Sequence, residues 1–415
     1  MGRGSTRDWF SDNRVMKILL LNTYPSGGGA AVACQRTMAL LSQAGMEVRM
    51  LTITEFGWQH RVSFLADRLD TLRAVGDQRK NLFRFSTAHY GLDIAHHPWV
   101  AWAEVIHIHW VQQGFLSVKG LAELLSIKGK RFFWTLHDFW PLTGGCHIPY
   151  AIGVDRETSF CQRFTVGCGS CPLLGSKSKQ DHSSRLFQSK KDLPLEQIHL
   201  VAVSNAVAKA VDASPLFSKS AITVLHNPID LKRFCPDSAT KKQESSLLLV
   251  ASRIDDPVKG PDLLVQMLRE AKALSEEWAS SASITLVGQI KDKSLLEQIP
   301  IPYRHIPRAE GEELVKLYQT ASTILSTSRY ETLGQTLVEG IACGTPAIAF
   351  GVGGIPDIIS PESGNGQLIR PYDTTAMARA VVHTPTPRDR KQIADTVRSF
   401  GIDAIAPQLL HLYTL

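Results

Sequence analysis

The chain has 415 residues, which is enough for two domains, because a single α/β core usually stops growing well short of that length. Hydrophobic residues make up 44% and charged residues 20%, so the composition is that of an ordinary soluble protein and excludes a disordered or fibrous one. No apolar run approaches the roughly 18 residues of a membrane span, and a net charge of +6 is too small to indicate nucleic-acid binding.

The first fourteen residues contain no apolar core of the kind that a secretory signal needs. We therefore expect a disordered leader at 1–14 on a cytoplasmic protein. Seven cysteines, an odd number, argue against a disulfide framework. After the leader, short apolar runs alternate with helical patterns, which predicts an α/β fold with a first domain at 15–231, a polar linker at 232–246 and a second domain at 247–390.

A glycine-rich loop follows the first predicted strand. Residues 15–22 form a continuous apolar run, as in a parallel strand covered on both faces, and the run leads into Gly27, Gly28 and Gly29 before a helical pattern. Glycines let the backbone approach a ligand closely, and a helix start favours negative charge. The loop also fits a plain tight turn, and it lacks the G-x-G-x-x-G spacing of a dinucleotide site.

Residues 61–85 alternate basic and apolar side chains. The segment fits an amphipathic element that faces a membrane or an acceptor. It also fits an ordinary helix that packs its apolar side on the core and leaves a solvated basic face, and we prefer this second interpretation.

Histidines mark two strand-like segments of the first domain. In residues 105–110 the period of two places His107 and His109 on one face, and without a third ligand nearby we favour a core or cleft-lining role over metal binding. Residues 132–138 end in His137 and Asp138 at the carboxyl end of a strand, where ligands of α/β sheets bind. His137 is therefore the better functional candidate.

The segment 144–172 is rich in cysteine and interrupts the α/β pattern. Two pairs of close ligands suit tetrahedral zinc, although the first pair here is widely spaced. Reduced thiols and disulfides are the alternatives to a structural zinc. A catalytic metal is not expected here, because four thiolates would close the coordination shell. The candidate ligands are Cys146, Cys161, Cys168 and Cys171.

The second domain begins with a strand at 246–251 and a loop that carries Arg253 and Lys259. The Arg253 guanidinium is planar and presents its N–H donors in a fork, whereas the Lys259 ammonium is a compact single charge. This combination suits a diphosphate at the carboxyl end of the strand. Taken alone, both side chains also fit solvated surface cations.

Residues 328–357 carry the densest pattern of the chain. A buried strand at 322–326 precedes a helix at 332–342, so Glu331 lies on the loop at the carboxyl end of the strand and Glu339 two helical turns later. The helix start offers backbone N–H groups of Leu333, Gly334 and Gln335 to an anion. Glu331 would then accept hydrogen bonds from sugar hydroxyls, since a carboxylate repels a diphosphate.

These residues resemble a known family. The series Arg329-Tyr-Glu331, Glu339-Gly, Gly344-Thr-Pro346 and Gly353-Gly-Ile-Pro-Asp357 is similar to the signature of the retaining, nucleotide-sugar-dependent glycosyltransferases of family 4. The cysteine-rich loop after His137 and Asp138 resembles that of the colanic acid glycosyltransferases of exopolysaccharide assembly. The resemblance implies the GT-B fold, with two facing Rossmann-like domains, parallel sheets, an interdomain cleft and a terminal helix at 391–415 that crosses back onto the first domain.

The resemblance also implies roles for individual residues. It places His137 beside the donor sugar, the loop of Gly27, Gly28 and Gly29 near the donor diphosphate, and Gly288 near the nucleotide base and ribose. In the mechanism that we expect, Arg253 and Lys259 stabilise the leaving diphosphate, Glu331 holds sugar hydroxyls and Glu339 holds those of the ribose.

The expected function is transfer of a hexose from a UDP- or GDP-sugar to a saccharide or lipid-linked acceptor, with retention, in surface polysaccharide biosynthesis. Peripheral contact with the inner membrane surface is part of this expectation, whereas nucleic acid is not a partner. No D-x-D triad occurs, so we expect no catalytic metal. The rivals are a sugar-nucleotide epimerase of the same fold, a phosphorylase, whose cofactor-lysine motif is missing, and a catalytically inactive binding protein.

Overall fold

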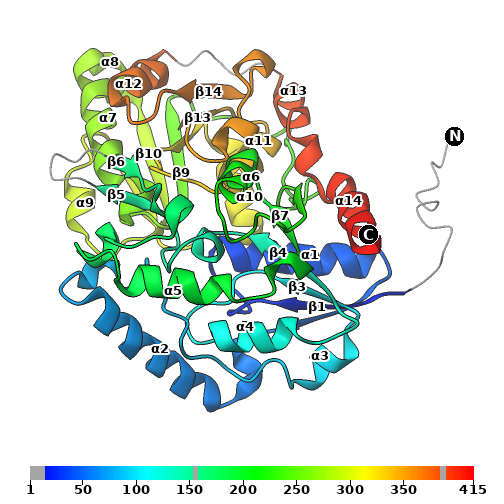
Figure 1. Ribbon diagram of the computed structural model, residues 1–415. Helices are drawn as coiled ribbons and strands as arrows, with labels where there is room; N and C mark the ends of the chain where they lie inside the picture. Colours follow the sequence, from blue (N-terminus) through cyan, green and yellow to red (C-terminus); the bar gives the residue numbers. More distant parts are fainter. Residues whose placement is uncertain (1–14, 153–157, 384–388) are drawn as a thin grey trace, which may run out of the picture.

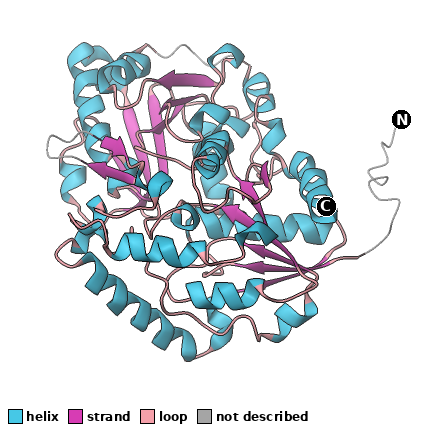
Figure 2. Cartoon of the chain, viewed as in Figure 1, coloured by secondary structure: helices cyan, strands magenta, loops and turns pink. Residues whose placement is uncertain are grey.

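The computed structural model describes residues 15–152, 158–383 and 389–415, and the leader expected at 1–14 lies outside this range. The described chain forms two six-stranded parallel sheets, each flanked by helices, and a two-stranded antiparallel hairpin. Figure 2 shows the two sheets as separate layers of strands with helices around and between them. The α/β class predicted from the alternating pattern is confirmed.

The first sheet has the strand order β2-β1-β3-β4-β7-β8, and all its described pairs are parallel. Helices join consecutive strands, as parallel pairing requires. The strands and helices of this half are β1 (Lys17–Leu21), α1 (Gly28–Gln43), β2 (Glu47–Leu51), α2 (Gln59–Val75), α3 (Pro98–Trp102), β3 (Val105–Ile108), α4 (Val118–Leu125), β4 (Arg131–Leu136), β5 (Tyr150–Ile152), β6 (Thr158–Phe160), α5 (His182–Lys191), β7 (Ile198–Ala202), α6 (Asn205–Asp212) and β8 (Ile222–Val224).

Strand β1 shows why the first apolar run has no polar alternation. Ile18 and Leu20 point into one apolar cluster and Leu19 and Leu21 into another, and all four side chains are fully buried. Because both faces of the strand are covered, every second residue has an apolar neighbour on its own side. Strand β1 is therefore apolar from Ile18 to Leu21.

The second sheet has the strand order β11-β10-β9-β12-β13-β14, again with parallel pairs. Strands β9 and β12 are neighbours, so the loops at their carboxyl ends lie side by side. The elements of this half are β9 (Ser246–Arg253), α7 (Pro261–Leu274), α8 (Glu276–Ser281), β10 (Ser283–Gln289), α9 (Ser294–Glu297), β11 (Tyr303–Ile306), α10 (Gly311–Thr320), β12 (Thr323–Ser326), α11 (Gln335–Ala342), β13 (Ala347–Phe350), β14 (Gly366–Ile369), α12 (Thr374–Val382), α13 (Arg390–Asp395) and α14 (Ile402–Thr414).

Helix α14 packs on the first domain, although it ends a chain whose preceding helices belong to the second. Its residues Leu409, Leu410 and Tyr413 lie in the same apolar cluster as Ile18 and Leu20 of β1. Figure 1 shows the helix, in red, beside the blue α1. The chain therefore passes between the domains twice, once near residue 230 and once near residue 400.

Helix α2 overturns our preferred interpretation of the basic and apolar segment. Its buried side chains include Ser63, Asp67 and Thr71, whereas Leu65 and Leu69 are more than half exposed. The expectation that the apolar side packs on the core is wrong. Helical periodicity shows that a helix has two sides, but it does not show which side faces inward.

Candidate active site

A lysine and a glutamate face each other at the carboxyl end of the second sheet. Lys259 Nζ lies 2.6 Å from Glu331 Oε1, and the Ser328 hydroxyl donates to the same oxygen over 2.7 Å. Both charged side chains are mostly buried, with 27% and 19% of their surface exposed. A lysine ammonium carries three N–H donors, so the pair with Glu331 still allows it to bind a phosphate oxygen.

Arg253 lies at the end of β9. Its Nε donates to Asp255 Oδ1 over 3.1 Å, and Asp255 Oδ2 accepts the backbone N–H groups of Lys291 and Asp292, both at 3.0 Å. Asp255 thus ties the arginine to the loop that follows β10. The guanidinium is held at the edge of the sheet where the predicted ligand would lie.

Glu339 bridges the two domains. Its Oε1 accepts from Arg36 Nη2 of α1 at 2.5 Å, and its Oε2 accepts from the buried Tyr318 hydroxyl at 2.9 Å. Both oxygens of this nearly buried carboxylate therefore have partners. A ribose diol that binds Glu339, as the sequence predicts, must replace at least one of them.

The glycine loop of the first domain faces the start of α11. Gly27 and Gly28 have φ angles of 88° and 76°, which favour glycine. The Gly29 carbonyl accepts from Gln335 Nε2 at 3.2 Å, and Gln335 Oε1 accepts from Arg36 at 3.3 Å. The structure thus brings together the loop and the helix start that the sequence analysis assigned to the diphosphate.

Leu333 and Gly334 precede α11 and are buried. Gly334 has a φ angle of 104°, and a side chain there would touch Ile358. Any contact of these two residues with an anion would come from the backbone, as expected for a helix start.

Gly288 has a structural reason to be glycine. A Cβ atom at this position would lie 1.9 Å from the Ala251 carbonyl oxygen, because the ends of β9 and β10 approach closely. This contact accounts for the residue type without a nucleotide. The position at the carboxyl end of β10 is nevertheless the one where the sequence analysis places the base and ribose.

His137 follows β4 and belongs to a chain of three histidines. Its Nε2 lies 2.8 Å from His109 Nδ1, and the His109 ring lies 4.6 Å from the His107 ring. Burial lowers the pKa of His137 to about 4 and that of His107 to about 3, and burial together with the neighbouring histidines also lowers the pKa of His109. His137 is therefore a neutral imidazole at neutral pH, suited to hydrogen bonding with hydroxyls.

Asp138, the residue after His137, does not bond to the His137 ring. Its carboxylate accepts from Trp110 Nε1 at 2.7 Å, from the Trp140 backbone N–H at 3.0 Å and bonds to His147 Nδ1 at 2.6 Å. The ring of His137 is oriented by His109 instead.

The loops of the two domains touch beside these residues. The Phe139 ring lies 5.4 Å from the Tyr330 ring, in an edge-on arrangement, and each ring lies within two residues of His137 or Glu331. Asp357 Oδ2 accepts the backbone N–H of Asn205 at the start of α6 over 2.7 Å. The segments that carry His137 and Glu331 therefore meet at the domain interface.

Arg36 and Tyr318, the partners of Glu339, were not predicted from the sequence. One signal for Arg36 was present, since it is the only charged residue in α1. A lone charge in a helix that follows a candidate phosphate loop has to face solvent or a partner of opposite charge. Tyr318 offered no comparable signal.

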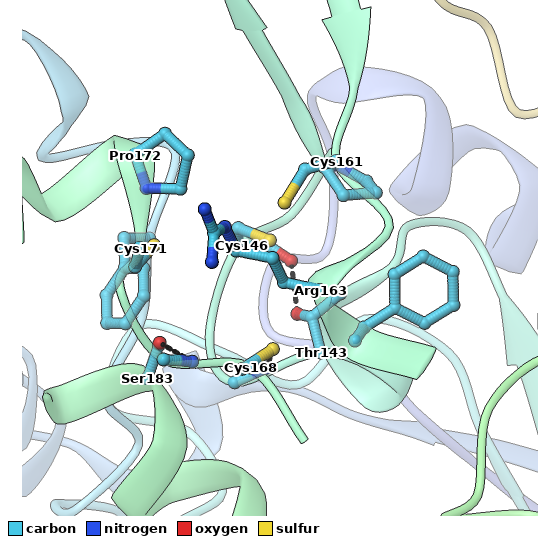
Figure 3. A pocket seen from close by; sticks show the side chains of 13 residues that line it. Thr143, Cys146, Cys161, Arg163, Cys168, Cys171, Pro172 and Ser183 are labelled. Carbon is cyan, nitrogen blue, oxygen red and sulfur yellow. Dashed lines mark hydrogen bonds between the residues drawn. The ribbon is translucent and has the colours of Figure 1, made fainter. Parts of the chain in front are cut away.

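The four cysteines of the insert line one small cavity of about 20 Å³, enough for about one water molecule. Figure 3 shows their side chains around this space, with the Arg163 side chain among them. Burial raises the pKa of Cys168 to about 12, and also that of Cys146, which favours neutral thiols.

The zinc candidate at these cysteines is not supported. Among the residues that the structure describes, no group of three or more His, Cys, Asp or Glu side chains is arranged to hold a metal ion. All seven cysteines are free, as the reduced-thiol alternative requires.

Comparison with known proteins connects the second domain to a family. Residues 233–384, less than half of the chain, match the family model described as glycosyl transferases group 1. A D-inositol 3-phosphate glycosyltransferase of Mycolicibacterium smegmatis is 22% identical over 397 residues, which are 87% of this chain and 81% of that protein. Its namesake in Mycobacteroides abscessus is 27% identical over 218 residues, or 50% of this chain. This chain spans about half the length of the latter relative, 46%.

Solved structures resemble the whole chain. A sucrose-phosphate synthase from Thermosynechococcus elongatus superposes with a TM-score of 0.63 at 19% identity, covering 96% of this chain and 98% of that chain. The Anabaena protein HepE, crystallised with UDP and glucose, gives a TM-score of 0.55 at 16% identity, covering 96% and 100%. The chain has the GT-B fold. In this GT-B protein, the segment that carries His137 meets the segment that carries Glu331 and its partner Lys259 at the domain interface.

In the part of the chain that the structure describes, no helix combines the length and the apolar character that crossing a bilayer requires.

Proposed function

We propose that this protein is a glycosyltransferase that moves a hexose from a UDP- or GDP-sugar to a saccharide or lipid-linked acceptor. The observation that carries the proposal is the pairing of Lys259 with Glu331 at the carboxyl ends of β9 and β12, beside the start of α11. A cation there suits a diphosphate and a carboxylate suits sugar hydroxyls. The match of residues 233–384 to glycosyl transferases group 1 supports the same activity.

The proposed mechanism neutralises the leaving group with fixed charges of the second domain. Departure of the sugar builds negative charge on the diphosphate, and Arg253, Lys259 and the N–H groups at the start of α11 are preorganised to stabilise it. Glu331 orients the sugar, and the neutral His137 supplies a further hydrogen bond from the first domain. The proposal includes retention of configuration, family 4 membership and no requirement for a divalent ion.

The comparisons support a sugar nucleotide as the donor. HepE was crystallised with UDP and glucose, and it has the same fold over 96% of this chain. By analogy, surface polysaccharide synthesis is the proposed setting, in which a lipid-linked acceptor would be met at the inner membrane surface from the cytoplasm.

A thermal-shift panel of UDP-, GDP- and ADP-sugars tests the proposal. We expect one class to raise the melting temperature, because a ligand that binds only the folded state at 100 times its Kd stabilises it by about 2.7 kcal/mol. Lys259→Ala and Glu339→Ala should abolish the rise. Lys293→Ala, an exposed lysine of the same domain, should preserve it.

Several outcomes would contradict this function or its mechanism. The first is a panel in which no sugar nucleotide raises the melting temperature, and the second is an unchanged rise in Lys259→Ala. The third is conversion of the UDP-sugar into an isomer when it is incubated alone, which would favour the epimerase. Bound nucleotide without turnover would indicate the inactive binding protein, and turnover only with a divalent ion would exclude the metal-free mechanism.

A further inference from the structure

Helix α2 carries its apolar side chains on the outside. Val62, Leu65 and Leu69 are 56%, 59% and 56% exposed, and Trp58, directly before the helix, is 73% exposed. The spacings of four, three and four residues place all four on one side of the helix. We refer to Trp58, Val62, Leu65 and Leu69 as the apolar α2 face.

The inward side of α2 is polar and tied to the first domain. The Ser63 hydroxyl donates to the Gly114 carbonyl over 2.6 Å, and Asp67 and Thr71 are fully buried. Ser63 is thus the residue whose side-chain hydrogen bond holds this side of α2 inward. This packing leaves the leucines on the outward side of the helix.

The apolar α2 face is a continuous patch. Other exposed apolar side chains, such as Leu274 and Tyr303, occur singly, as is normal for protein surfaces. Beside the helix, Phe83 adds a further ring that is 59% exposed, and the Arg68 guanidinium lies 4.4 Å from its centre. A patch of this kind marks a surface that another body covers.

The charges around the patch identify the chemistry of that body. Arg61 and Arg73 are exposed and lie on opposite flanks of the apolar α2 face. The nearby carboxylate of Asp70 is engaged by His89 at 2.8 Å. An apolar stripe with cations on both sides and a tryptophan at one end suits the boundary between anionic headgroups and acyl chains.

We propose that α2 docks the protein on an anionic membrane surface, with the apolar α2 face inserted and Arg61 and Arg73 against the headgroups. In Figure 1 the helix runs along the outer edge of the first domain. The inference rests on the proposed function, because a lipid-linked acceptor would lie at such a surface. It adds the part of the protein that contacts that surface.

Co-sedimentation with vesicles tests the docking without any transfer reaction. Vesicles of phosphatidylglycerol and phosphatidylcholine should bind the protein, and binding should weaken with salt. Vesicles of phosphatidylcholine alone should bind it at least tenfold more weakly. The double variant Leu65→Glu/Leu69→Glu should lose binding, and Arg61→Gln and Arg73→Gln should each reduce it about fivefold. The matched control Leu274→Glu/Tyr303→Glu places the same charges on isolated exposed positions and should bind like the wild type.

Two results would overturn the docking. One is equal sedimentation of the Leu65→Glu/Leu69→Glu variant and the wild type. The other is no binding of the wild type to vesicles that contain phosphatidylglycerol. If the wild type is then a dimer that this variant converts to a monomer, the apolar α2 face joins two copies instead. The sugar-nucleotide thermal shift of the variant should stay at the wild-type value, so failure of docking and failure of donor binding are separate observations.

Discussion

Three histidines in the first sheet are held without charge. His107 has bonds at both ring nitrogens, to Thr135 at 2.7 Å and to the Tyr413 hydroxyl at 2.5 Å, and it is fully buried beside His109. The unfolded chain binds protons at histidine below a pH of about 6.5, whereas burial lowers the pKa of His107 to about 3 in the folded chain. Its contribution to stability is therefore complete above pH 6.5 and is lost as the pH falls toward 3.

Replacing His107 by glutamine should reduce the pH dependence of folding. Between about pH 7.5 and about pH 5, one such histidine removes about 2 kcal/mol of stability, because only the unfolded state takes up its proton. The loss measured by urea unfolding should be smaller by that amount in His107→Gln, since glutamine keeps a donor and an acceptor. Asp67, whose pKa burial raises to about 6, acts in the opposite direction equally in both proteins. Identical pH profiles would contradict the assignment.

At the level of single residues, the sequence predicts the face of a strand on which a side chain lies better than it predicts the hydrogen-bond partner of that side chain. The alternation in β3 correctly placed His107 and His109 on one side of the strand, as their ring contact confirms. Their hydrogen-bond partners come from segments far away in the chain, Tyr413 among them, and no local pattern encodes such a pairing. The same holds for Glu339, whose partner Arg36 is 303 residues away.

Individual strands were more predictable than the orientation of helices. Runs of apolar residues identified β1, β9 and β12 because a buried parallel strand needs apolar side chains on both faces. Strand β11 was missed, and its burial explains why: Tyr303 and Arg304 are exposed at the edge of the sheet. Helix α2 was predicted with the wrong side inward, since amphipathicity alone does not reveal the covering partner.

The close approach of β9 and β10 makes Gly288 sensitive to substitution. Gly288→Ala should destabilise the protein by more than about 2 kcal/mol, because its Cβ would overlap a backbone oxygen that cannot rotate away. Gly45→Ala is a matched control, with a φ angle of 82° and open space around the Cβ, and should cost only about 1 kcal/mol of backbone strain. Urea unfolding measures both. A Gly288→Ala protein as stable as Gly45→Ala would show that the strands can separate at this point.

At the scale of the whole molecule, the charged pair of Arg36 and Glu339 links the two domains at the proposed site. Arg36 and Glu339 have only 15% and 7% of their side chains exposed, and they join α1 of the first domain to α11 of the second. Removing one member of a buried pair leaves the other charge without compensation. Loss of either member would therefore leave an unpaired charge at the domain interface, and the pair occupies the carboxylate predicted for ribose.

Arg36→Ala should lower the free energy of unfolding by about 3 kcal/mol. Arg36→Lys keeps a positive charge near Glu339 and should cost less. The control Arg73→Ala removes an exposed arginine and should stay within about 0.5 kcal/mol of the wild type. If Arg36→Ala and Arg73→Ala are equally stable by urea unfolding, the link contributes nothing to domain closure.

The double passage of the chain between the domains restricts how they can part. Ile229 N–H donates to the Phe400 carbonyl at 2.8 Å, and Ile402 N–H donates back to the Ile229 carbonyl at 3.1 Å, so the outgoing and returning backbones are joined side by side. Because the two backbones are joined, they bend together. The domains can then rotate relative to each other about one axis, whereas a single connecting segment would allow several. A protease cut between residues 232 and 245 would consequently not release either half, because the returning backbone and helix α14 would still hold them together.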